Sequence, residues 1–180
     1  MRCFPLYLGK NIYQSKNKYQ KVLNQLKMSQ IHEGTWIDAG CGYGTYSLPL
    51  STLVSRVIAI DEDPHKINYF RSSLPQQTNI ECYVRNFNED ELFHELVDGI
   101  LFGYSLHYQP DPTGALKNAC RQIKKNGSIV IIDYDRMSPL PWVPHPLPRV
   151  KSLKILKEIG FKNLETTFKD GRIYIVRGIK

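Results

Sequence analysis

The sequence predicts an α/β protein whose doubly wound, mainly parallel sheet carries helices on both faces. Apolar runs of strand length alternate with helical segments along most of the 180 residues, which is typical of a parallel sheet with crossover helices. The glycine-rich run DAGCGYG at residues 38–44 follows the first apolar run, as in a strand that turns into a helix beside a ligand. Asp170-Gly171 separates the last two apolar runs and predicts a terminal antiparallel hairpin.

Periodicity and capping place the elements of the first half. Apolar residues recur at helical spacing from Tyr19 to Leu26, which predicts an amphipathic helix before the first strand. Asp63-Pro64 supplies an N-cap and a first helical residue. The expected elements are a helix over 16–30, a strand over 35–39, a helix over 45–53, a strand over 57–61, a helix over 64–73, a strand over 80–85, a short helix near 89–96 and a strand over 99–104.

Proline and glycine divide the second half. Five prolines between residues 138 and 148 exclude both a helix and a central strand there. Gly160 follows a helical pattern and ends it. The expected elements are a helix from 112 to about 123, a strand over 128–134, a helix over 149–159, and strands over 163–169 and 172–178.

Composition favours one globular domain over residues 1–180 without a membrane span, because no apolar run approaches about 20 residues. The first residues contain no signal-peptide core, and four widely spaced cysteines suggest reduced thiols. We therefore expect a cytoplasmic protein without a metal site. Residues 1–30 hold six bases and no acid, and form a basic helical segment. Solvated helix faces explain such scattered lysines, and a nucleic-acid surface is the alternative.

Two strand ends predict a nucleoside site. Asp38 ends the first strand, and Asp61 ends the second, seventeen residues beyond Gly44. An acid at the second position suits a ribose with both hydroxyls free. A dinucleotide fingerprint, G-x-G-x-x-G, would need a third glycine where Thr45 stands, so the G-x-G-x-G spacing favours a different nucleoside.

These segments resemble the class I S-adenosylmethionine-dependent methyltransferases. Residues 38–44 resemble their first motif, D-x-G-x-G-x-G, and VIAID at 57–61 resembles the second. VDGILFGYSLH at 97–107 and IKKNGSIVI at 123–131 resemble the fourth and fifth, although Asn126 stands where proline or glycine is commoner. The resemblance spans about residues 31–135. It implies a seven-stranded sheet of order 3-2-1-4-5-7-6 and S-adenosylmethionine as cofactor.

The resemblance also implies a cofactor site at the strand ends. Asp38 would engage the methionine amino end, Asp61 the ribose, and Asn86 the adenine, with Phe87 against its ring. A turn residue at the strand end is the alternative for Asn86, and a core phenylalanine is the alternative for Phe87. Gly44 is expected mainly to let helix and strand pack closely. The predicted cofactor-binding residues are Asp38, Gly40, Cys41, Gly42, Gly44, Asp61, Asn86, Phe87 and Ser105.

Acceptor chemistry is assigned to the ends of the fourth and fifth strands. His107 and Asp133 are the candidate catalytic residues, since a histidine pKa near 6.5 suits a general base; a structural role at a helix start is the alternative for His107. Residues 136–148 are expected to form a lid that brings Trp142 and His145 to the acceptor beside Tyr108. A rigid surface loop that packs on itself is the alternative for this segment.

We expect in-line methyl transfer to a small-molecule acceptor. A nucleic-acid methyltransferase is the first alternative, but the tetrapeptide [DNS]-P-P-[YFW], common where base amino groups are methylated, is replaced by YSLH at 104–107. A non-catalytic cofactor-binding subunit of a partner enzyme is the second alternative, because cofactor binding would leave the same sequence pattern.

Overall fold

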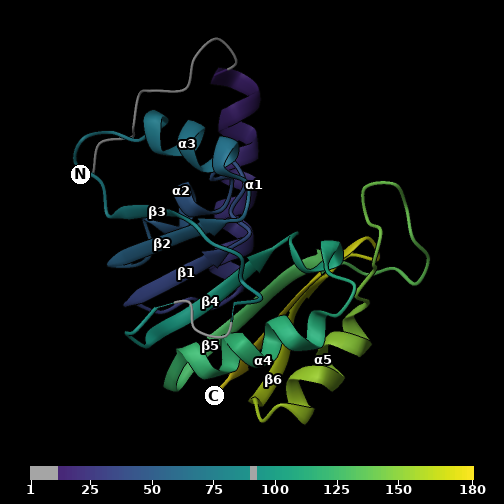
Figure 1. Ribbon diagram of the computed structural model, residues 1–180. Coiled ribbons are helices and arrows are strands. Elements are labelled where there is room, and N and C mark those ends of the chain that lie inside the picture. The colour runs from purple at the N-terminus through teal and green to yellow at the C-terminus, as the bar shows by residue number, and fades with distance from the viewer. Residues whose placement is uncertain (1–11, 90–92) are drawn as a thin grey trace.

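The computed structural model describes residues 12–89 and 93–180, with seven strands in one sheet between two layers of helices (Figure 1). The strands are β1 (Thr35–Ala39), β2 (Arg56–Asp61), β3 (Ile80–Val84), β4 (Val97–Gly103), β5 (Ile123–Tyr134), β6 (Lys162–Lys169) and β7 (Ile173–Ile179). The helices are α1 (Ile12–Met28), α2 (Ser47–Leu50), α3 (Pro64–Ser73), α4 (Pro112–Gln122), α5 (Arg149–Glu158) and the 3-10 turn η1 (Leu106–Tyr108).

The sheet has the order β3-β2-β1-β4-β5-β7-β6, which confirms the predicted order. The five strands from β3 to β5 run parallel, and β7 is antiparallel to both β5 and β6. Asp170 closes the terminal hairpin, since its carboxylate accepts hydrogen bonds from the backbone N–H groups of Arg172 and Ile173. The chain reverses its direction of winding between β1 and β4, so a crevice is expected at the carboxyl ends of these strands.

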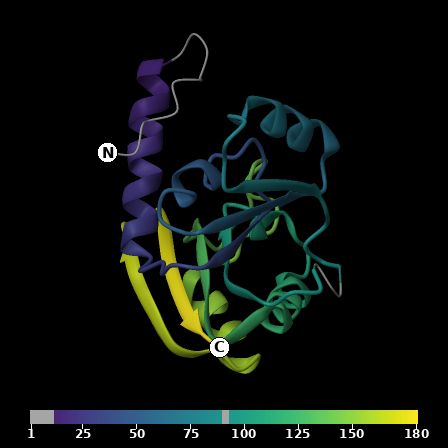
Figure 2. The same ribbon diagram turned by 90° about the vertical axis from the view of Figure 1, so that its left-hand side faces the viewer.

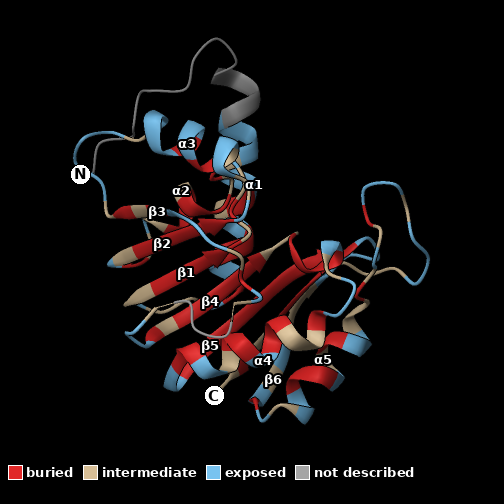
Figure 3. Ribbon diagram, viewed as in Figure 1, coloured by how far each residue is buried: buried red, intermediate tan, exposed pale blue. Residues whose placement is uncertain are grey.

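The two faces of the sheet carry separate apolar cores. Trp36 points to the layer of α1, α2 and α3, whereas its neighbour Ile37 points to the layer of α4 and α5, as the two-residue period of a strand requires. Figure 3 shows the central strands almost wholly buried and the outer helix surfaces exposed. The strands are thus covered on both sides, which explains their continuous apolar runs.

Helix α1 stands beside the C-terminal strands (Figure 2), and polar contacts as well as apolar ones hold it. Val22 and Leu26 are buried at the spacing that predicted the helix. Gln25 is buried between them, and its side-chain oxygen accepts a hydrogen bond from Tyr46 Oη at 2.7 Å. This bond fixes α1 next to the turn that follows β1. Residues 1–11 of the predicted basic segment lie outside the described residues.

Three elements differ from expectation. The short helix predicted near 89–96 is absent from the described part of that stretch, where the Gln122 amide instead bonds the backbone of Phe93 and Glu95. Helix α2 is a single turn, ending at Leu50. Strand β5 begins at Ile123, which pairs with Val97, so that residue is buried in the sheet and not on a helix.

Gly44 offers a test of the packing that shapes the turn after β1. Its φ is +80°, and a Cβ there would lie 2.1 Å from Phe70 Cε2 in the core. We expect Gly44→Ala to lower the free energy of unfolding by about 2–5 kcal/mol, from backbone strain plus overpacking. Gly171 is the matched control, since its φ is +83° but a Cβ there meets nothing within 4 Å.

Gly171→Ala should cost only the strain, about 1–2 kcal/mol. Urea unfolding of both variants measures the difference. Equal losses would mean that Phe70 moves aside without cost, and that the glycine is needed for its conformation alone.

Candidate functional site

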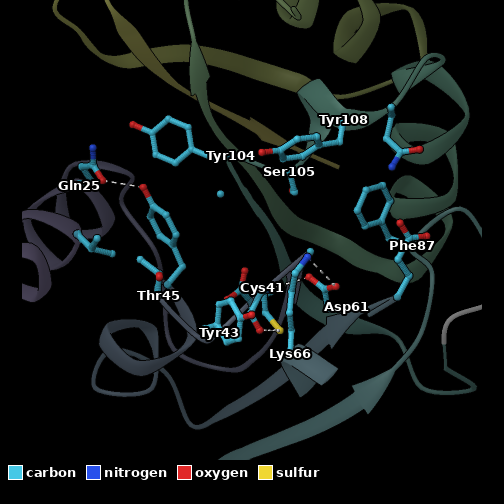
Figure 4. Close-up of a pocket in the computed structure, with 18 of the residues that line it drawn as sticks. Gln25, Cys41, Tyr43, Thr45, Asp61, Lys66, Phe87, Tyr104, Ser105 and Tyr108 are labelled. Atoms are coloured by element: carbon cyan, nitrogen blue, oxygen red, sulfur yellow. Dashed lines mark hydrogen bonds and ion pairs between the residues drawn. The ribbon is translucent and has the colours of Figure 1, made fainter. Parts of the chain in front are cut away.

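A cavity of about 640 Å³ opens at the carboxyl edge of the sheet, where the winding reverses (Figure 4). Most of the predicted site residues line it together: Asp38, Gly40, Cys41, Gly42, Asp61, Asn86, Phe87, Ser105 and Tyr108. Gly44 does not line it and lies against Phe70, in agreement with its expected packing role.

The glycine turn brings bare backbone to the edge of the cavity. Gly40 and Cys41 both donate backbone hydrogen bonds to Ile60 O at 2.9 Å. Gly42 has a φ of +56°, and a Cβ at this position would meet nothing within 4 Å. Because Gly42 lines the cavity, a side chain there would fill space that a ligand could occupy. The turn therefore allows close approach of a ligand to the backbone.

Asp61 presents a carboxylate whose orientation is fixed. Its Oδ2 accepts a hydrogen bond from Gly42 N at 2.9 Å, and its Oδ1 accepts one from Asp63 N at 3.0 Å. Lys66 Nζ lies 3.8 Å from Oδ1. Each oxygen keeps acceptor capacity toward the cavity that the residue lines. Two fixed acceptors side by side match a pair of neighbouring hydroxyl groups.

Asp38 is a buried carboxylate with an unusual proton affinity. Its side chain is 1% exposed, and Ser47 Oγ donates to its Oδ2 at 2.6 Å. The pKa of Asp38 is raised to about 7, mainly by burial and in smaller part by the nearby charge of Asp61, while the Ser47 hydrogen bond opposes the shift. A carboxylate in this state gains most from a cationic group placed against it.

Asn86 and Phe87 form the wall beside Asp61. Asn86 Nδ2 donates to Glu62 Oε2 at 2.7 Å, and its Oδ1 accepts from Asn88 N at 2.9 Å. Asn86 thus shapes its own turn, while its carbonyl oxygen keeps one further lone pair. Phe87 is buried edge-to-face against Phe102, with ring centroids 5.5 Å apart, and offers an apolar ring to the cavity.

His107 and Asp133 form a buried pair behind the cavity. Their side chains are 2% and 1% exposed, and His107 Nδ1 lies 2.7 Å from Asp133 Oδ1. Neither residue lines the cavity, so the geometry does not support the predicted direct action on an acceptor. The His107 ring instead contacts Tyr108 and Tyr134, at centroid distances of 4.3 and 5.5 Å. The pair positions these tyrosines.

The prediction of a lid over residues 136–148 is wrong. The segment extends away from the sheet (Figure 1), and none of its residues, all of which are described, lines the cavity. Trp142 is 56% exposed and His145 is exposed. Buried Val143 and Leu147 anchor the segment, with Leu147 O accepting from Tyr174 Oη at 2.8 Å. The prolines therefore stiffen a surface loop, which is the alternative prediction for this segment.

Comparison with known proteins identifies the chain. Residues 32–171 match the family model described as a methyltransferase domain. The chain belongs to this methyltransferase family. An uncharacterized chloroplastic methyltransferase of Arabidopsis thaliana is 28% identical over 122 residues, which cover 63% of this chain and 35% of that protein. The chain therefore matches about a third of the length of that relative.

Solved structures of low sequence identity share the fold of this chain. A SAM-dependent methyltransferase from Aquifex aeolicus aligns with a TM-score of 0.75 at 22% identity, covering 92% of each chain. The N-methyltransferase NodS from Bradyrhizobium japonicum, solved with S-adenosyl-L-homocysteine, aligns with a TM-score of 0.73 at 18% identity, covering 96% of this chain and 90% of that one. The family and fold expected from the four motifs are confirmed.

The cavity has a second half that contains none of the predicted cofactor-binding residues. We call this the acceptor half and the part around Asp38, Gly42, Asp61 and Phe87 the nucleoside half. The acceptor half is lined by Lys18, Lys21 and Gln25 of α1, and by Tyr46, Tyr104 and Tyr134. Figure 4 shows Gln25 and Tyr104 across the cavity from Asp61 and Phe87. Of these residues, Tyr104 could have been predicted from the sequence, because it stands beside Ser105 at the end of β4.

Two kinds of feature are absent from the described ranges of the methyltransferase. No helix in 12–89 or 93–180 combines the length and apolar character of a membrane span. Within the same residues, no three His, Cys, Asp or Glu side chains gather in a way that could hold a metal ion.

The raised pKa of Asp38 predicts a pH-dependent stability for the methyltransferase. A proton held more tightly in the folded state stabilises that state; this contribution is full below the ordinary pKa of 3.8 and is lost as the pH rises through about 7. Asp38→Asn should therefore match the wild type near pH 4 and exceed its stability at pH 8, by an amount on the order of a few kcal/mol. Thermal unfolding across this pH range measures the difference.

Asp170→Asn is a control with the opposite sign. Backbone N–H groups of Ile173 and Arg172 lower the pKa of Asp170, so its stabilising contribution is present above the ordinary pKa and is lost as the pH falls. Relative to the wild type, that variant should lose stability as the pH rises toward the ordinary pKa of 3.8, and the difference should stay nearly constant at higher pH, where Asp38→Asn gains stability. A pH-independent difference for Asp38→Asn would show that Asp38 is not protonated near neutrality.

Proposed function

We propose that this methyltransferase moves a methyl group from S-adenosylmethionine to a small-molecule acceptor. The observation that carries the proposal is one cavity with two unlike halves, one suited to a nucleoside and one lined by α1 and tyrosines. A volume of about 640 Å³ is in the range of small-molecule sites. A cavity with both halves in one chain supports turnover over the role of a non-catalytic subunit.

The nucleoside half fits the donor through its own residues. Asp61 would accept hydrogen bonds from two ribose hydroxyls, Asp38 would face the amino group of the methionine end, and Phe87 would lie against the adenine. Open space beside Gly42 leaves room for the ligand next to the backbone. When bound, S-adenosylmethionine supplies a methyl group on a sulfonium sulfur; a lone pair of the acceptor forms the new bond, and the electron pair of the broken C–S bond stays on sulfur.

The protein contributes mainly position and exclusion of water. Such a contribution is worth about 7–11 kcal/mol at best. Burial raises the pKa of Tyr46 and that of Tyr104, the latter to about 12, so neither side chain acts as a base near pH 7. The cavity therefore favours an acceptor atom that already has a free lone pair at neutral pH, such as an aromatic amine.

The class of acceptor can be tested by following a labelled methyl group from the donor to its product. Incubation of the protein with methyl-labelled S-adenosylmethionine and cell extract should place label in the small-molecule fraction. Label mainly in RNA or DNA would instead support the nucleic-acid alternative, with the basic residues of the N-terminal segment as its binding surface. Absence of label from every fraction, together with tight donor binding, would support the role of a cofactor-binding subunit.

Asp61 provides the sharpest test of the donor assignment. Asp61→Asn keeps the shape of the side chain but removes its charge, and the amide group would turn a donor toward a ribose hydroxyl or toward Gly42 N. We expect a loss of affinity for S-adenosylhomocysteine of about 2–3 kcal/mol, measured by calorimetry.

Asp111→Asn makes the same chemical change outside the cavity, at the exposed N-cap of α4, where asparagine also caps well. Its affinity should equal that of the wild type. Retained affinity in Asp61→Asn would remove Asp61 from the site, and binding of NAD without binding of S-adenosylhomocysteine would contradict the donor assignment as a whole.

A further inference from the structure

The acceptor half carries a continuous aromatic wall. Tyr104 and Tyr134 have ring centroids 4.9 Å apart, and His107 continues the contacts from Tyr134 to Tyr108. The three tyrosines line the cavity, whereas His107 lies behind them and is held by Asp133. Rings fixed by such contacts present flat apolar faces at low entropic cost, and flat aromatic groups pack well against them.

Tyr104 occupies a backbone conformation that is costly for its residue type. Its φ is +56°, and its N–H donates to Ile132 O at 2.9 Å, which ties it to the end of β5. Glycine would adopt this conformation more easily. A large aromatic residue held there at the edge of the cavity points to a function for the ring itself.

Polar groups of the acceptor half are donors and cations. Lys18 and Lys21 are three residues apart on α1, so they share a face of the helix, and both line the cavity. The oxygen of the Gln25 amide is already engaged by Tyr46 Oη at 2.7 Å. The NH₂ group of Gln25 hydrogen-bonds to Tyr104, so its second N–H is the donor that remains for a ligand.

Acidic side chains are confined to the other half. Among the described residues that line the cavity, the carboxylates are Asp38, Asp61 and Glu62, all at the ends of β1 and β2. Asp133 is buried behind the aromatic wall. Asp170 lines a neighbouring hollow with Lys21, and the pKa of that carboxyl is lowered mainly by backbone hydrogen bonds and in smaller part by the charge of Lys21. Lys18, in contrast, lines the main cavity and not that hollow. Tyrosine faces alone would also attract a cation, but two lysines beside them repel one. Both charge and hydrogen-bonding capacity favour an anion.

We propose that the acceptor is a small planar aromatic molecule with a carboxylate, whose ring packs against Tyr104 and Tyr134 and whose carboxylate faces Lys18, Lys21 and the Gln25 amide. This proposal rests on the proposed function, because it takes the nucleoside half as the donor site. It names the substrate class by its two recognition elements, a flat ring and a negative charge.

A matched panel of probes separates the two elements. We would measure binding to the protein saturated with S-adenosylhomocysteine, using 4-aminobenzoate, its uncharged amide, the saturated 4-aminocyclohexanecarboxylate and the cation 4-aminobenzylamine. The aromatic carboxylate should bind at least about tenfold more tightly than each of the others, a difference of about 1.4 kcal/mol. Equal or tighter binding of the amide or the cation, or no millimolar binding of the carboxylate, would overturn the proposal.

Variants connect the preference to the named residues. Changing Lys18→Met and Lys21→Met together should weaken 4-aminobenzoate binding about tenfold and leave the affinity of the amide unchanged, because only the charge is removed. Tyr104→Leu should weaken both, and Tyr104→Phe should weaken neither. Lys27→Met, which removes a charge from α1 away from the cavity lining, is the matched control and should change nothing.

Affinity for S-adenosylhomocysteine distinguishes failure of the proposed function from failure of the proposed acceptor class. It should stay within about twofold in all these variants, since none alters the nucleoside half. Failure of the wild-type protein to bind S-adenosylhomocysteine would contradict the proposed function itself. Normal donor binding with an unaltered probe preference in the lysine double variant would contradict the acceptor class alone.

Discussion

The site depends on one set of hydrogen bonds that joins the glycine turn to the end of β2. Gly40 N and Cys41 N share Ile60 O as their acceptor, and Gly42 N donates to the Asp61 carboxylate. These bonds place an acid directly beside bare backbone and align the ends of two adjacent parallel strands. Asp38 is buried behind the same turn and lies near enough to Asp61 for that charge to raise its pKa. The nucleoside half is thus one rigid unit.

The parts of the fold and of the candidate site that could be predicted from the sequence are those that local patterns determine. The terminal hairpin follows from a turn dipeptide, and Asp38, Asp61 and the glycine turn follow from strand-end acids and glycine spacing, all of which act over a few residues. The strand order and the roles of Asn86 and Phe87 were predicted only from the resemblance to the methyltransferase family. The 136–148 segment was misplaced because prolines determine stiffness but not direction; buried Val143 and Leu147 determine the direction. His107 was misread because its partner, Asp133, is 26 positions away, and only the fold shows that the pair is buried.

The acceptor half was missed for a related reason. Gln25 interrupts the apolar stripe of α1 and would be expected at the surface, yet it is buried because Tyr46 satisfies its amide oxygen. Lys18 and Lys21 belong to the basic segment and are exposed on the helix surface, as expected for scattered lysines, but they also line the cavity. Their positive charges come from a different part of the chain than the acids at the ends of β1 and β2, so no local run of sequence displays the charges that line the acceptor half.

Helix α1 lines the acceptor half of the cavity and supplies no residue to the nucleoside half. It is attached through the Gln25–Tyr46 bond, through apolar contacts with α2 and through its position beside β6. A change on its cavity face would alter acceptor recognition while leaving the hydrogen bonds of the glycine turn intact. On the proposed function, the fold separates two selective pressures: the donor site can stay constant while helix α1 diversifies, and new acceptor specificities can arise without loss of donor binding.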